Sequence, residues 1–317
     1  MKKKASLQNG IQNNKSFIQN NFSFIGLLLV VLVFEYLTKG KLLTTKNFMN
    51  IFNNFFTIGL GAVGVMFLMS LGELDLSVGA ILGLTAAIGA FAANISLVLI
   101  LPMALLTGLI IGTLNGLLIS RLKVESFIGT LAVSFVARGM TTWLLNGSVG
   151  IPVSMRVFDK NIVKIMVFIL VMIVFYILFE YTGFGKKCRA IGASQDAARQ
   201  SGVNVERVRM IAFMISGFLC GLAGFFSLVR TCTASSKTGS AFEFNVLLAV
   251  LFGGMPLSGG WAVKFRAAVV GSIAMAVMYN GMSLMGIDGL TQQVVQGIIL
   301  IVIVVISFDR RNAVVIK

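Results

Sequence analysis

The chain contains a series of apolar stretches, each close to 20 residues long, and this pattern leaves very few folds open to it. A helix needs about 20 apolar residues to cross the roughly 30 Å of hydrocarbon in a bilayer. Of the 317 residues, 57% are hydrophobic and 12% are charged, against about 25% charged in an ordinary soluble domain. Because lipid satisfies no backbone polar groups, the spanning segments must be helical. We therefore expect an all-α, polytopic membrane protein.

The apolar stretches predict a bundle of about ten transmembrane helices in a single membrane domain, residues 23–308, between polar tails at 1–22 and 309–317. The expected spans are residues 23–38, 54–71, 77–94, 97–120, 127–145, 161–180, 210–229, 242–257, 265–284 and 290–308. Segment 71–77 (LGELDLS) carries two carboxylates between two short spans. A re-entrant or broken helix fits this segment as well as a plain loop.

The basic residues are unevenly distributed over the segments that connect these spans. With the N-terminal tail inside, most of the 26 Lys and Arg residues fall on the cytoplasmic side. This bias predicts that both tails are cytoplasmic and that the number of helices is even. Much of the net charge of +15 then orients the chain and attracts anionic lipid headgroups, so nucleic acid is not an expected partner.

The first apolar segment is of spanning length and no small-x-small cleavage site follows it, so we expect a retained helix and not a signal peptide. The chain has no His, and Cys188, Cys220 and Cys232 lack metal-ligand spacing, so neither a metal site nor a Cys/His catalytic site is expected. A G-x-x-x-x-G-K-[ST] phosphate loop is also missing from the sequence. An enzyme is therefore not expected, and any ATP that drives the protein is hydrolysed by another chain.

Four blocks of sequence occur in an order that points to a family. They are ELDLSVGAILGLTA from Glu73, NGLLISRLKVESFIGTLAVSFVARGMTTWLLNG from Asn115, RAIGASQDAARQSGVNVERVRMIAFMISGFLCGLAG from Arg189, and LLAVLFGGMPLSGGW from Leu247. From Gly72 to Arg310 the chain resembles the permease subunits of binding-protein-dependent ABC importers of the ribose, xylose, galactose and autoinducer-2 type.

The resemblance implies import of a small polar solute, such as a ribose-type monosaccharide, by alternating access in a bacterial cytoplasmic membrane. It also implies three protein partners: a cytoplasmic ABC ATPase, an extracytoplasmic solute-binding protein, and a second permease copy, identical or different. ATP and Mg²⁺ would bind to the ATPase, and this chain would hold no cofactor.

Residues 183–209 form a basic segment between two apolar runs, with the signals of a helix, a turn and a second helix. Ser194 can cap a short helix, with Asp196 in its first turn, and Gly202 can end it. The resemblance implies that this short cytoplasmic helix docks into a cleft on the ATPase. The expected contacts are the polar Arg189, Asp196 and Arg199 and the small Gly192, Ala193, Ala197 and Gly202. The alternative is an ordinary cytoplasmic loop whose charges only set topology.

Four polar residues near membrane depth are candidates for the translocation path: Asp75, Ser77, Asn115 and Arg138. Burying an ionisable group in a membrane is costly, so such groups are often functional. Asp75 can equally cap the helix that begins at Ser77 or pair with a basic residue. For Arg138, a structural ion pair is the commoner outcome. Where the family commonly has Gly-Ile before Asp-Leu-Ser, this chain has Glu73 and Leu74.

Two other functions remain open from the sequence. One is an ABC permease for nucleosides or branched-chain amino acids. The other is an ATP-independent channel or secondary transporter, for which broken helices in corresponding positions of two inverted halves would be expected. The sequence shows no convincing repeat of that kind. The small-residue pairs Gly108/Gly112 and Gly217/Gly221 predict close helix packing and say nothing about the solute.

Overall fold

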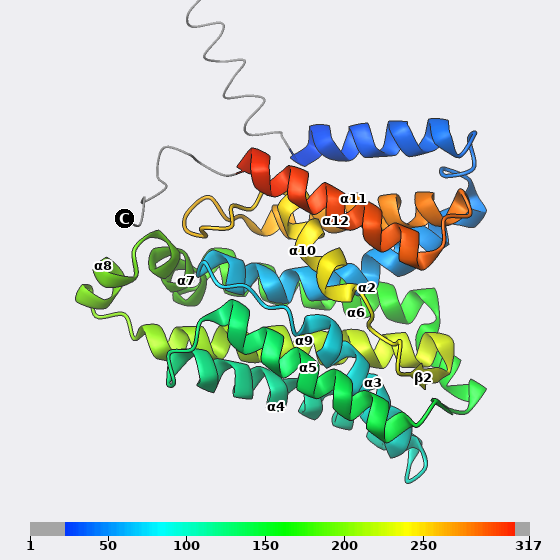
Figure 1. Cartoon of the computed structure of the whole chain (residues 1–317), viewed down its shortest axis with the longest axis horizontal. Helices are drawn as coiled ribbons and strands as arrows, with labels where there is room; N and C mark the ends of the chain where they lie inside the picture. The colour runs from blue at the N-terminus through cyan, green and yellow to red at the C-terminus, as the bar shows by residue number, and fades with distance from the viewer. Residues whose placement is uncertain (1–22, 308–317) are drawn as a thin grey trace, which may run out of the picture.

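The computed structural model describes residues 23–307, which are almost entirely helical (Figure 1). Both predicted tails, 1–22 and 309–317, lie outside the described residues. Within the described part, six helices are long and apolar enough to cross a membrane. They are α2 (Thr45–Ser70), α4 (Ile100–Ser120) with the 3-10 turn Leu97–Leu99 before it, α5 (Ser126–Leu145), α6 (Asn161–Tyr176) with the π-helical turn Ile177–Tyr181, α9 (Val205–Thr231) and α11 (Phe265–Leu284).

Four further apolar helices are shorter in their described, apolar parts. They are Ser23–Leu37, α3 (Val78–Ala93), α10 (Phe242–Phe252) and the part Gly289–Ile303 of α12 (Gly289–Ser307). The prediction of a helical membrane bundle is thus confirmed, whereas ten full-length spans are not observed.

The remaining elements mark the two ends of the bundle (Figure 1). The short helices α7 (Gly183–Ala193) and α8 (Gln195–Gln200) project at one end, which we call the α8 end. At the opposite end, β1 (Ser148–Gly150) pairs in antiparallel fashion with β2 (Thr233–Ser235), and the 3-10 segment Val153–Asp159 follows β1. We call this the strand end.

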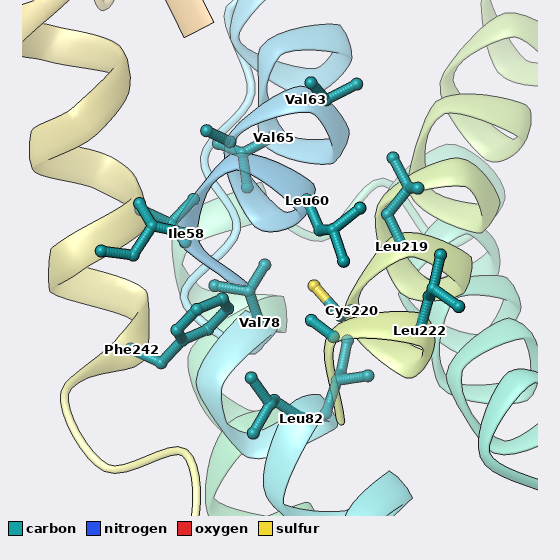
Figure 2. Packing of buried hydrophobic residues seen from close by; sticks show 14 of the residues in the cluster. Ile58, Leu60, Val63, Val65, Val78, Leu82, Leu219, Cys220, Leu222 and Phe242 are labelled. Atoms are coloured by element: carbon teal, nitrogen blue, oxygen red, sulfur yellow. The ribbon is translucent and has the colours of Figure 1, made fainter. Parts of the chain in front are cut away.

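The core is built around α2 and α9, which are largely buried. Figure 2 shows Leu60 of α2, Val78 and Leu82 of α3, Leu219 of α9 and Phe242 of α10 packed together. These contacts place both short helices, α3 and α10, at the centre of the molecule.

The predicted glycine pairs bring α4 and α9 into direct backbone contact. A Cβ added to Gly112 would lie 2.5 Å from Phe213 O, and one added to Gly217 would lie 2.9 Å from Gly112 Cα. A Cβ added to Gly221 would likewise lie only 2.7 Å from Ala104 O. The glycines therefore allow two helix backbones to meet where any side chain would separate them, as the small-residue spacing predicted.

The helices α3 and α10 are too short to cross a bilayer as helices. Their 16 and 11 residues give lengths of about 24 and 17 Å at 1.5 Å per residue, against roughly 30 Å of hydrocarbon. Each is preceded by non-helical chain, residues 71–77 before α3 and 236–241 before α10. The broken-helix alternative for 71–77 is confirmed, and the expected continuous helix over 242–257 is wrong, since it ends at Phe252.

The non-helical segment 71–77 runs inside the protein beside the first half of α5. Leu74 N donates to Ser126 Oγ at 3.3 Å, and Leu76 N donates to Thr130 Oγ1 at 3.2 Å. These hydroxyls replace the helical partners that Leu74 and Leu76 lack. Non-helical chain is tolerated at membrane depth because the protein, and not lipid, surrounds it.

The two discontinuous spans run in opposite directions and meet at the N-termini of their helices. A Cβ on Gly79 of α3 would lie 2.7 Å from Gly239 O, and one on Gly83 would lie 2.6 Å from Thr238 O. From this level α3 continues toward the strand end and α10 toward the α8 end (Figure 1). The sequence offered a broken helix only at segment 71–77, and the break before α10 was not predicted.

Candidate functional site

The basic segment folds as the predicted sequence of helix, turn and helix. Ser194 Oγ accepts a hydrogen bond from Ala197 N at 3.3 Å and caps α8. Gly202 ends the turn at φ +82°, a left-handed conformation that favours glycine. Asn204 Oδ1 then accepts from Arg207 N at 2.9 Å at the start of α9.

Five of the seven docking candidates lie on the exposed surface of this segment, which projects from the bundle at the α8 end (Figure 1). They are Ala193, Asp196, Ala197, Arg199 and Gly202. Arg199 forms an exposed ion pair with Glu206 at 2.6 Å. The small and polar residues of α8 are therefore available to another protein.

The other two candidates, Arg189 and Gly192, face the chain itself, which corrects their expected place on the docking surface. Arg189 Nη1 donates to Glu180 Oε2 at 2.9 Å, and Nη2 donates to Phe179 O at 3.0 Å. A Cβ on Gly192 would collide with Ser70 O and lie 2.6 Å from Gly260 N. Both residues hold α7 against the bundle and so position α8 indirectly.

The cysteine beside Arg189 is part of the packed interior. The Cys188 side chain is fully buried, and this burial raises the pKa of its thiol to about 12. All three cysteines are buried and none forms a disulfide.

An ion pair connects the discontinuous span to the start of α9. Arg209 Nε lies 2.7 Å from Glu73 Oε1, and both side chains are nearly buried. Arg209 Nη2 also donates to Gln195 Oε1 of α8 at 3.1 Å. A polar cavity of about 430 Å³ lies around these groups. The carboxylate that departs from the family pattern thus ties segment 71–77 to α8.

Three of the four path candidates form one buried network at the N-terminus of α3. Asp75 Oδ1 accepts from Ser77 N at 2.9 Å and from Ser77 Oγ at 2.6 Å. Asn115 Nδ2 donates to Ser77 Oγ at 2.8 Å. A fourth member, Ser216 of α9, donates to Asp75 Oδ2 at 3.2 Å; a hydroxyl within an apolar helix had given no signal in the sequence.

Arg138 lies apart from this network and forms the structural ion pair that was the commoner expectation. Its Nη2 is 2.9 Å from Glu243 Oε2 and donates to Gly239 O at 3.2 Å. Glu243 is in the first turn of α10, where the helix dipole favours a carboxylate. The pair therefore fixes the N-terminus of α10 against α5.

The comparisons with known proteins agree with this architecture. The profile of the family described as branched-chain amino acid transport system / permease component matches residues 47–304. The chain is similar to the ribose import permease protein of Bacillus subtilis (strain 168), with 31% identity over 92% of each chain. It is also 31% identical to the L-arabinose ABC transporter permease protein of Azospirillum brasilense, over 92% of this chain and 89% of the relative.

A third relative, the xylose transport system permease protein of Escherichia coli (strain K12), is 28% identical over 93% of each chain. No solved structure is significantly similar to the chain. The resemblance to permeases of ABC importers is confirmed, and with the apolar helices it shows a multi-pass protein of the cytoplasmic membrane. The chain therefore belongs to the branched-chain amino acid transport system / permease component family.

Proposed function

We propose that this permease is the membrane subunit of an ATP-driven ABC importer for a monosaccharide. Relatives named for ribose, arabinose and xylose transport align with more than nine tenths of the chain. A ribose-type sugar is accordingly the first solute to test. The family description names branched-chain amino acids instead, so an amino acid such as L-leucine is the matched alternative.

The proposed orientation puts the α8 end in the cytoplasm. The basic residues of segment 183–209 lie at that end, in agreement with the positive-inside bias. Both tails are then cytoplasmic, and ten spans result when the two discontinuous spans are each counted once. A cytoplasmic ATPase would carry ATP and Mg²⁺, while a solute-binding protein would deliver solute at the strand end. A second permease copy would complete the membrane unit.

One observation carries the mechanism: α8 is exposed for docking and yet connected to the middle of the membrane. Gln195 of α8 bonds Arg209, Arg209 pairs with Glu73, and Glu73 is two residues from Asp75 at the N-terminus of α3. A second contact runs through α7, because Gly192 packs directly against the carbonyl oxygen of Ser70, the last residue before the segment. A force on α8 would thus reach segment 71–77 through Arg209 and through α7.

At the point where α3 and α10 meet, such a force could change which side of the membrane the solute path opens to. Each helix covers only part of the membrane thickness, and backbone contact between Gly79 and Gly239 would close the path between the two helices. Displacement of segment 71–77 would move the N-terminus of α3 relative to α10, which Arg138 and Glu243 hold to α5. Alternating access would then need only a small shift of α3 relative to α10.

The test uses the permease reconstituted with its ATPase and binding protein in proteoliposomes. Ala197→Trp on the exposed face of α8 should abolish ATPase binding and sugar uptake while the permease still inserts. Asn94→Trp, an exposed residue at the strand end, serves as the control and should leave ATPase binding unchanged. Sugar flux through permease alone, without ATPase or nucleotide, would disprove the proposal and favour a secondary transporter.

A further inference from the structure

A cavity of about 370 Å³ lies between α2, α9, α10 and α11, in the half of the molecule toward the strand end. Its volume falls in the range of roughly 300–1,000 Å³ that is typical of small-molecule sites. The side chains that decide its chemistry are Asn54, Ser227, Arg230, Phe242, Asn245 and Tyr279. It is separate from the buried network of Asp75 and from the cavity beneath α8.

The position of the cavity links the strand end to the middle of the membrane. Arg230 is in the last turn of α9, at the strand end. Phe242 and Asn245 are in the first turn of α10, near the level where α3 and α10 meet. No side chain caps α10, whose N-cap residue is Ala241. The N-terminus of α10 therefore borders the inner part of the cavity, although Glu243 in its first turn offsets the positive end of the helix dipole.

Several polar groups of the cavity have no partner within the described part of the chain. Asn245 is only 9% exposed, and its Oδ1 accepts no hydrogen bond there. A buried acceptor without a donor is destabilising, so such a group commonly marks a binding position. No hydrogen bond or ion pair to another described residue is found for the side chains of Asn54 and Arg230. Asn54, Arg230 and Asn245 thus come from three elements and line one space, the first two of them partly open to solvent.

The combination of these groups selects a chemical class. Two amides and a guanidinium offer both donors and acceptors, which suits adjacent hydroxyl groups, and Phe242 and Tyr279 offer apolar faces for the carbon skeleton. The lining contains no Asp or Glu, so the ammonium group of an amino acid would find no counter-ion.

We propose that this cavity is a solute-binding site, contained within one permease subunit, for a neutral polyhydroxylated molecule of monosaccharide size. The proposal rests on the proposed sugar import and adds to it the residues that contact the solute. Solute would reach the site from the strand end and move on when α10 shifts relative to α3.

The first experiment measures D-ribose, D-xylose and L-arabinose uptake by the full complex, with L-leucine as the alternative solute. Asn245→Leu and Asn54→Leu should each raise the KM for the transported sugar at least tenfold. Asn245→Leu should leave the melting temperature unchanged or higher, because it removes an unpaired buried acceptor. A purely structural asparagine would show the opposite, a lowered melting temperature.

Asn50→Leu is the matched control for Asn54→Leu. Asn50 is on the same helix, one turn nearer the strand end. It is exposed and does not line the cavity. The Asn50→Leu variant should therefore keep the wild-type KM for the sugar. If the wild type transports a sugar, and both Asn245→Leu and Asn54→Leu transport it with the wild-type KM, the cavity proposal is overturned. If the wild type transports L-leucine and none of the sugars, the proposed function itself fails.

A second experiment detects the solute at the site without transport. All native cysteines are buried, so Ser227→Cys introduces one accessible thiol in the cavity. A membrane-impermeant methanethiosulfonate added from the strand end should label it, and millimolar D-ribose should slow labelling at least fivefold. In the Asn245→Leu background this protection should disappear. Labelling that sugar does not slow, in a permease that transports ribose, would contradict the site.

Discussion

Two ionisable residues inside this membrane domain, Asp75 and Arg138, are each held by specific partners. Asp75 is surrounded by hydroxyl donors, and Arg138 by a carboxylate and a carbonyl oxygen. The sequence identified these two residues because ionisable groups in apolar runs are rare. It did not identify Ser216 or Glu243, since the first is an uncharged hydroxyl and the second was read as the edge of a span.

The ion pair of Arg138 and Glu243 can be tested by removing one or both partners. Arg138→Ala leaves the carboxylate of Glu243 unpaired at the N-terminus of α10, and we expect a loss of about 2 kcal/mol, between the values for exposed and buried pairs. The melting temperature in detergent measures this. The double variant Arg138→Met with Glu243→Leu should recover most of the loss. A double variant no more stable than Arg138→Ala would show that the pair is not the cause.

At the scale of elements, close backbone packing and broken spans explain most of the architecture. The helices α4 and α9 pack through glycines, while α3 and α10 are short helices that are each preceded by non-helical chain. The glycine spacing was visible in the sequence. The break in segment 71–77 was visible only as an alternative, because LGELDLS has no single preferred conformation.

Gly217→Ala should destabilise the contact between α4 and α9. Its Cβ would lie 2.9 Å from Gly112 Cα and still closer to Gly108 O, both of them backbone atoms that cannot move aside. We expect a cost of about 1–3 kcal/mol, typical of overpacking, measured as a lower melting temperature. Gly139→Ala on α5 is the matched control, because no atom lies within 4 Å of its added Cβ. Equal effects of the two variants would refute this account.

The link from α8 to segment 71–77 makes a prediction about coupling. Glu73→Gln removes the charge that pairs with Arg209, so ATP hydrolysis should continue while solute transported per ATP falls about tenfold, equivalent to ~1.4 kcal/mol. Parallel assays of phosphate release and uptake measure this ratio. Glu206→Gln, which breaks the exposed pair with Arg199, should have little effect, since exposed pairs contribute little. An unchanged ratio in Glu73→Gln would exclude the link.

At the scale of the whole molecule, two discontinuous spans of opposite direction meet in the middle of one helical bundle. Discontinuous helices near the middle of the membrane are also typical of secondary transporters. Family membership, and not the broken helices, therefore decides between the two classes.

The orientation of the bundle can be measured directly. Gln200→Cys at the α8 end should react with a membrane-impermeant maleimide only from the cytoplasmic side, and Asn94→Cys at the strand end only from outside. Both residues are exposed, and the native cysteines are buried, so the background should be low. Labelling of both positions from the same side would contradict the proposed topology.

The sequence alone determined that this chain is a helical membrane protein, where its short polar helix between two spans lies, and which family it resembles. These properties follow from local features: hydrophobic length, capping residues and ordered motifs. Only the tertiary structure decided the pairing of Glu73 with Arg209, the burial of Arg189, and the meeting of α3 with α10. Those contacts join residues far apart in the chain, and no local propensity records which distant partner will satisfy a polar group that folding removes from water.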